Sequence, residues 1–62
     1  MSVDWNAVYR ATFPGLVRFL HRKVWDPERA RDLAQEAFVR ALREEPEQPR
    51  AWLFQVAAHL AR

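Results

Sequence analysis

Acidic side chains recur at helical spacing around the segment RDLAQEAF, residues 31–38. Glu28, Asp32 and Glu36 stand four residues apart, so in a helix they form one column, and Gln35 lies beside it. Like charges at this spacing repel one another by about 0.2–0.5 kcal/mol per pair. A small basic chain that displays such a column requires a physical reason for it.

Two interpretations of this acidic column remain open. In the first, arginines neutralise a solvated surface, because Arg29 precedes Asp32 by three residues and Arg40 follows Glu36 by four. In the second, the column docks a basic partner, and the amide of Gln35 adds a hydrogen-bond donor and an acceptor. Position and spacing alone do not decide between them.

A second set of polar and aromatic residues shares one helical side near the C-terminus. Trp52, Gln55, His59 and Arg62 follow one another at i, i+3, i+7 and i+10. Such side chains hold unstacked bases and phosphates, since aromatic stacking is worth about 1–3 kcal/mol per base and arginine supplies charge. Core packing near the preceding loop is the alternative interpretation of Trp52.

Catalytic and metal-binding chemistry lacks its usual residues in this sequence. Cysteine is absent, Ser2 is the single serine, and neither His21 nor His59 stands near a nucleophile that it could activate. The histidines also lack a second ligand at metal-binding spacing. We therefore expect no enzyme, no metal site and no cofactor.

The elements that must position these residues are predicted to be three helices. Apolar residues between positions 5 and 24 recur at the three-and-four spacing of a buried helical stripe. This stripe comprises Trp5, Val8, Tyr9, Thr12, Phe13, Leu16, Val17, Leu20 and Val24. Pro14 cannot donate a backbone hydrogen bond, so we expect the first helix to kink or break around residues 11–13.

The second and third helices are bounded by prolines. Asp26 can cap a helix whose first residue is Pro27, and this helix should end at about Arg43 or Glu44. The third should begin near Pro49. The predicted core residues are Ala30, Leu33, Ala34, Ala37, Phe38, Ala41 and Leu42 in the second helix, and Leu53, Val56, Ala57 and Leu60 in the third. The sequence predicts an all-α, small three-helix bundle.

Length and composition agree with one small domain spanning residues 1–62. Half of the 62 residues are hydrophobic and 29% are charged, as in globular proteins. The N-terminus lacks an apolar signal region, and no apolar stretch approaches the roughly 20 residues that cross a bilayer. We therefore expect a soluble, unprocessed, cytoplasmic protein that does not contact membranes. The net charge is +2, and nine of the ten basic residues are arginine.

The order of these pieces resembles region two of bacterial sigma factors. The similarity rests on YRATFPGLVRFLHRKVWDPERARDLAQEAFVRAL, followed by a proline-marked loop and PRAWLFQVAAHLAR. The ordered pair D-L-x-Q-E-x-F and R-A-W-L-F is most similar to the extracytoplasmic-function branch. The resemblance implies a helical domain that binds the coiled coil of the largest RNA polymerase subunit, then recognises and helps to melt the minus-ten promoter element. It also implies an anti-sigma factor as a further partner.

The resemblance assigns roles to both sets of residues. It places polymerase binding on Asp32, Gln35 and Glu36, with Glu28 in the same column. The promoter-melting segment falls on residues 50–62. There Trp52 is implied to lie near the upstream edge of the melted DNA, Gln55 and His59 to face the non-template strand, and Arg50 and Arg62 to meet phosphates.

Three departures from the family pattern accompany the resemblance. His59 stands where members often carry asparagine, and the loop EEPEQPR is shorter and more acidic than the usual loop. The chain also ends inside the promoter-melting segment, so we expect a form truncated at its C-terminal end. Two other functions remain open: a helical interaction module that binds polymerase or an anti-sigma factor without a DNA role, and a helix-turn-helix binder of duplex DNA.

Overall fold

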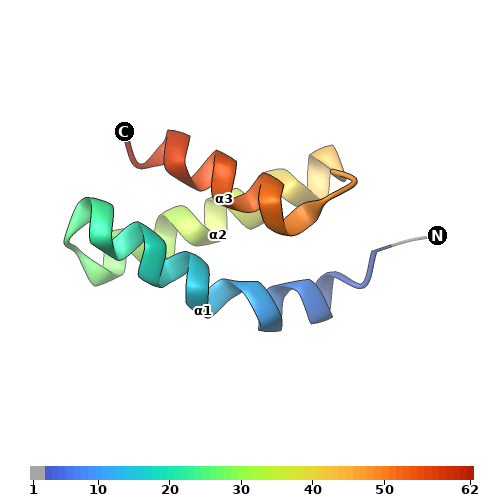
Figure 1. Ribbon diagram of the computed structural model, residues 1–62, viewed down its shortest axis with the longest axis horizontal. Helices are drawn as coiled ribbons and strands as arrows, with labels where there is room; N and C mark the ends of the chain where they lie inside the picture. Colours follow the sequence, from blue (N-terminus) through green and yellow to red (C-terminus); the bar gives the residue numbers. More distant parts are fainter. Residues whose placement is uncertain (1–2) are drawn as a thin grey trace.

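Three helices packed side by side make up the described part of the protein (Figure 1). The structure is a computed structural model that describes residues 3–62, so Ser2 lies outside the described residues. Helix α1 spans Trp5–Val24, α2 spans Pro27–Glu44 and α3 spans Pro49–Leu60, and residues 3–62 contain no strand. The predicted all-α three-helix fold is confirmed.

Helix α1 continues through Pro14 without a break. Pro14 has no N–H to donate to the carbonyl oxygen of Arg10, one turn earlier. Both residues are exposed, so water can satisfy that oxygen, and the lost hydrogen bond does not end the helix. Figure 1 shows α1 changing direction between its blue and teal halves. The helix therefore bends where a kink was expected, and the alternative of a broken helix is wrong.

The connections between helices have the residues that helix ends require. The Asp26 carboxylate accepts hydrogen bonds from the backbone N–H groups of Glu28 (3.0 Å) and Arg29 (3.3 Å), and Pro27 occupies the first helical position of α2. Residues 45–48 then connect α2 to α3, which begins at Pro49. Both predicted starts are confirmed, and so is the predicted end of α2 at Glu44.

The Asp26 cap gives a testable prediction about stability. The Asp26→Ala variant leaves two N–H groups of α2 without their acceptor, and we expect it to lower the free energy of unfolding by about 1 kcal/mol. Thermal unfolding followed by circular dichroism measures this loss. Asp4→Ala is the matched control, because Asp4 caps α1 through one bond of 3.2 Å near the chain end and should contribute less. Equal losses of stability in the two variants would contradict the assignment of Asp26 as the stronger of the two helix caps.

The core is formed by leucines of α1 and α3 around small side chains of α2. Its buried apolar residues are Leu16, Leu20, Ala30, Ala34, Ala37, Phe38, Ala41, Leu53 and Ala57. The four buried alanines of α2 leave little side-chain bulk between the helices, so the neighbouring helices can approach α2 closely. Helix α2 contacts both of the others and holds them in place.

Two residues predicted to be in the core lie at its edge instead. Leu42 is 54% exposed and Tyr9 is 40% exposed. The Tyr9 ring stacks on Phe13, with centroids 4.6 Å apart, and lies 5.1 Å from the Phe38 ring. The ring of Tyr9 thus covers the core from outside. Leu42 is exposed because it lines an open groove between α1 and α2, which Trp5 and Tyr9 cover only in part.

Candidate functional site

The outer side of α2 carries the acidic column predicted from the sequence. Glu28, Asp32 and Gln35 are exposed, whereas Glu36 accepts a hydrogen bond from Arg40 Nη2 at 2.9 Å. This is the only ion pair within residues 3–62, so Asp32 has no ion pair with Arg29. Neutralisation by arginine therefore applies to Glu36 alone, and the other two carboxylates remain available to a partner.

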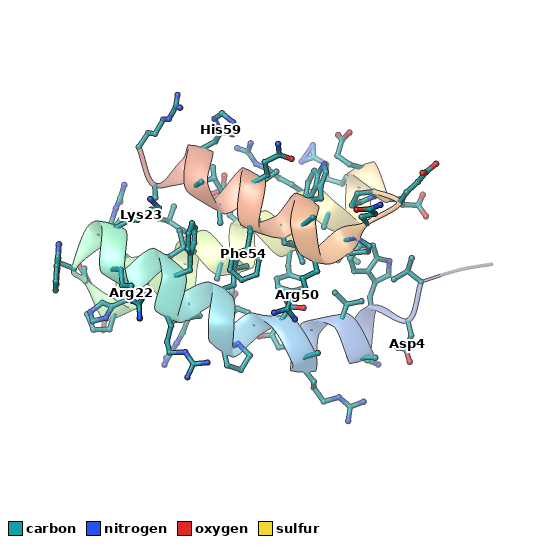
Figure 2. The ribbon with its side chains drawn as sticks, in the orientation of Figure 1. Asp4, Arg22, Lys23, Arg50, Phe54 and His59 are labelled. Atoms are coloured by element: carbon teal, nitrogen blue, oxygen red, sulfur yellow. The ribbon has the colours of Figure 1, made fainter. Side chains whose placement is uncertain are left out.

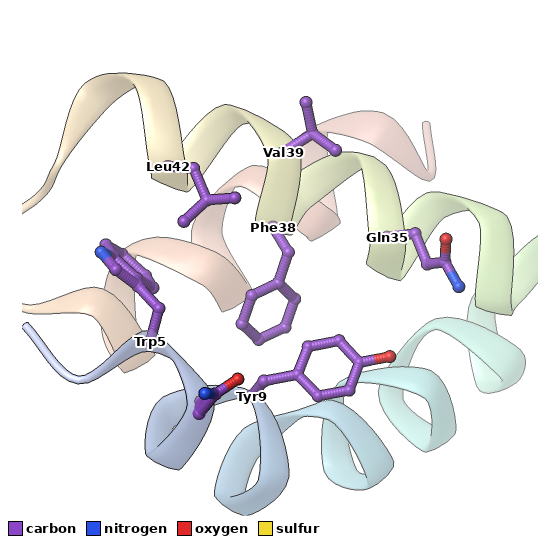
Figure 3. Close-up of a pocket in the computed structure, with 7 residues that line it drawn as sticks. Trp5, Tyr9, Gln35, Phe38, Val39 and Leu42 are labelled. Atoms are coloured by element: carbon purple, nitrogen blue, oxygen red, sulfur yellow. The ribbon is translucent and has the colours of Figure 1, made fainter.

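An open apolar groove adjoins this acidic column. It has a volume of about 310 Å³ and runs between the N-terminal half of α1 and the C-terminal half of α2 (Figure 3). Its lining residues are Trp5, Asn6, Tyr9, Gln35, Phe38, Val39 and Leu42. Gln35 belongs both to the predicted docking residues and to the groove, so the acidic and apolar surfaces are continuous.

The apolar half of this surface is not among the sites predicted from the sequence. Val39 follows Gln35 by four residues and is 54% exposed, so it extends the exposed side of α2 by one turn. Leu42 was assigned to the core, although its three-residue spacing from Val39 places it on the same exposed side. The signal for this extension in the sequence is the spacing of Val39 and Leu42, two apolar residues that continue the side of the helix on which Gln35 lies.

The polar side of α3 is also present in the structure. Gln55 and His59 are exposed, Trp52 is half-buried, and Arg62 follows the end of the helix and is exposed. Figure 2 shows His59 on the edge of α3 that faces away from α1. This side is therefore exposed at Gln55, His59 and Arg62, whereas Trp52 packs against the core.

Arg50 does not join the polar side of α3. Its guanidinium carbon lies 6.0 Å from the centroid of the Phe54 ring, which in turn meets the Phe19 ring of α1 edge-on at 5.3 Å. Figure 2 shows Arg50 and Phe54 between α3 and α1, on the opposite edge from His59. Arg50 and His59 are thus on different edges of α3, and one short segment of nucleic acid would have to cross the helix to reach both.

Trp52 borders two hollows, one lined by arginines and Glu44 and the other by acidic residues. On one side a hollow of about 400 Å³ brings it together with Arg40, Arg43, Glu44 and Val56. On the other side a hollow of about 350 Å³ is lined by Trp52, Gln55 and the acidic connection between α2 and α3. Arg40 and Arg43 are not among the site residues predicted from the sequence, because no spacing along the chain shows that the end of α2 lies beside Trp52.

Comparison with known proteins supplies the observation that decides the family. The family model of Sigma-70 region 2 matches residues 8–62. The chain belongs to the Sigma-70 region 2 family. No curated protein and no solved structure gives a significant match. Region 2 is a transcription-factor domain that binds RNA polymerase and recognises promoter DNA during initiation, and the family is not a catalytic one.

The matched segment includes every residue of this region 2 domain that was assigned to a site from the sequence. It also covers Tyr9, Val39 and Leu42, which border the groove, and all but the first residues of α1. Within residues 3–62 no group of three histidine, aspartate or glutamate side chains could hold a metal ion. In the same part of the chain, no helix combines the length and the apolar character needed to cross a membrane.

Proposed function

We propose that this region 2 domain docks on the coiled coil of the largest RNA polymerase subunit through the outer side of α2. Asp32, Gln35 and Glu36 would make the polar contacts, with Glu28 at the edge. The observation that carries this proposal is the unpaired state of Asp32 and Glu28 on the exposed side of a helix whose neighbouring surface is apolar. Complementary charge on a basic partner would relieve the repulsion within this column.

The apolar groove supports a helical partner in particular. A helix that presents basic side chains to Asp32 and apolar side chains to Val39 and Leu42 would cover the whole exposed length of α2. The groove is continuous with Gln35, so one partner surface can reach both parts. Apolar burial would supply affinity, while the charges would fix orientation and speed association.

The second part of the proposal concerns promoter DNA. Trp52, Gln55 and His59 would face the unpaired non-template strand of the minus-ten element, and Arg62 would meet a phosphate. The two hollows beside Trp52 support this division of roles. Arg43 favours phosphates on one side, where Arg40 is paired with Glu36, while the acidic connection disfavours them on the other. Arg50 would reach only a phosphate on the α1 edge of α3.

A crosslinking experiment with polymerase core and promoter DNA tests both parts together. A photo-crosslinking amino acid in place of Trp52 should label the non-template strand within the minus-ten element once the chain has bound core polymerase. The same amino acid in place of Ala11, an exposed residue of α1, is the matched control and should not label that element. Labelling from position 11 alone, or from neither position, would support an interaction module without a DNA role.

Two finer assignments belong to the same proposal. The motifs D-L-x-Q-E-x-F and R-A-W-L-F support placement in the extracytoplasmic-function branch, with an anti-sigma factor as a further partner for the outer side of α2. A polymerase partner would place the protein in the bacterial cytoplasm. A duplex-binding helix-turn-helix function is less well supported, because the family match concerns region 2 over nearly the whole chain.

A further inference from the structure

Trp25 ends α1 as a left-handed C-cap, with its N–H donating to the carbonyl oxygen of His21, but its side chain lies outside the core. It is 80% exposed, and its ring meets the His21 ring edge-on, with centroids 6.3 Å apart. Its φ is 58°, in the left-handed region that glycine adopts most readily and that is disfavoured for a bulky residue. A glycine would suit this backbone better, and the indole buries almost nothing in return.

Helix α1, which precedes this ring, carries four cations and no acidic residue, namely Arg10, Arg18, Arg22 and Lys23. Lys23 Nζ lies 5.2 Å from the centroid of the Phe19 ring, and the acidic residue Asp26 directly follows Trp25. Arg18 and Arg22 lie one turn apart on its exposed side, and neither belongs to the one ion pair found in residues 3–62. The last-turn cations also stabilise the C-terminal end of the helix dipole, but that effect fades beyond the last turn and involves neither Arg18 nor Trp25.

We propose that Trp25 stacks on a base of single-stranded DNA while Arg18 and Arg22, two turns and one turn earlier on α1, bind the flanking phosphates. A stacking ring among cations is the arrangement that binds single strands with little sequence preference. The other exposed large apolar residues are Val3, Tyr9, Val39 and Leu42, and the last three border or adjoin the groove at the other half of α2. Without apolar neighbours of its own, the Trp25 surface fits a charged polymer better than an apolar protein surface.

The position of this turn relative to α3 supports single-stranded DNA as the partner. This step of the inference rests on the proposed role of α3 in promoter binding. Figure 1 shows the α1–α2 turn and the C-terminal end of α3 at the same end of the domain. The domain is 20 Å across along the second of its three principal axes. A strand that follows the polar side of α3 from Trp52 to His59 leaves it at this end. Because that side of α3 faces away from α1 (Figure 2), the strand would turn around this end of the domain to reach Trp25.

Substitution of the ring tests the stacking role with the 62-residue chain alone. Fluorescence anisotropy with a labelled oligothymidine at low salt should show at least about fivefold weaker binding for Trp25→Gly than for the unsubstituted chain. Trp25→Phe keeps an aromatic ring and should retain most of the affinity. Trp25→Gly should unfold at the same or a higher temperature, because glycine suits the left-handed backbone.

Substitution of the cations tests the phosphate contacts through salt dependence. For single strands each neutralised phosphate contributes about 0.7 to the slope of log affinity against log salt, so Arg18→Gln/Arg22→Gln should reduce the slope by about 1.4. Arg10→Gln is the control, because Arg10 is an exposed cation two turns earlier on α1 and should leave the slope unchanged.

Several results would overturn this inference while leaving polymerase docking intact, because docking is measured without DNA. They are undetectable binding of the oligonucleotide by the unsubstituted chain, equal affinity for duplex and single strand, and unchanged affinity of Trp25→Gly. A large fall in the unfolding temperature of Trp25→Gly would assign the indole a structural role instead. Loss of polymerase capture by that variant would assign it to a protein partner.

Discussion

Capture of the chain by the isolated polymerase coiled coil is expected to fail when two carboxylates of α2 are reversed together, in Asp32→Arg/Glu36→Arg. Each reversal removes a negative charge from the docking surface and places a positive charge opposite a basic partner. Truncating one member of a charge pair that is buried at an interface costs about 2–5 kcal/mol, and like-charge contacts add to this loss. We therefore expect the dissociation constant to rise by roughly thirtyfold or more.

The fold should survive this double substitution, which makes the binding result interpretable. The Glu36–Arg40 pair is about half exposed on both sides, and exposed pairs of this kind contribute less than about 1 kcal/mol to stability. Glu45→Arg/Glu47→Arg makes the same change in net charge in the connection between α2 and α3, away from the outer side of α2. Unchanged capture by the α2 variant, or equal loss in both variants, would show that the docking assignment is wrong.

The helix boundaries could be predicted because local chemistry determines them. Asp26 caps the first N–H groups of α2, and Pro27 has no N–H that would need an acceptor. Pro49 also lacks an N–H and for this reason suits the first position of α3. Pro14 was harder to interpret, since the same residue either bends or ends a helix. Apolar residues on both sides of Pro14, such as Phe13 and Leu16, pack against the rest of the protein and keep the two halves of α1 joined.

Burial at the edge of the core could not be predicted from one helix alone. A heptad-like pattern shows which residues of α2 share a side, but the neighbouring helices determine how wide the covered side is. The sequence predicts that Leu42 lies in the core together with Phe38. In the structure α1 and α3 cover the alanine side of α2, and Leu42 lines the open groove beside Val39.

The candidate sites show the same division between local and tertiary information. Residues on one helix, such as Gln55 and His59, were grouped correctly by spacing, and both are exposed. Arg50 was grouped with them by its place in the motif, although its guanidinium lies over Phe54 toward α1. Arg40 and Arg43 come beside Trp52 only because α2 and α3 pack together. Contacts between helices are therefore the part of the site that requires the structure.

A matched pair of leucine substitutions separates the core from the docking surface. Leu20 is fully buried and Leu42 is 54% exposed, so the same change to alanine meets two different environments. Leu20→Ala should lower the free energy of unfolding by about 2–5 kcal/mol, through lost apolar burial and the cavity left behind. A chain of this length is stable by only about 3–9 kcal/mol, so much of the variant should be unfolded at moderate temperature.

Leu42→Ala should cost less than about 1 kcal/mol, because most of that side chain already contacts water. Urea denaturation of both variants measures the difference. Equal losses of unfolding free energy would show that Leu42 belongs to the core, as the sequence predicts. Capture by the polymerase coiled coil should show the reverse order at low temperature, when both variants are folded. Leu42→Ala removes an apolar contact from the groove and should weaken binding, whereas Leu20→Ala leaves the docking surface unchanged. Opposite rank orders in the two measurements would establish that α2 uses one side for the core and the other for its partner.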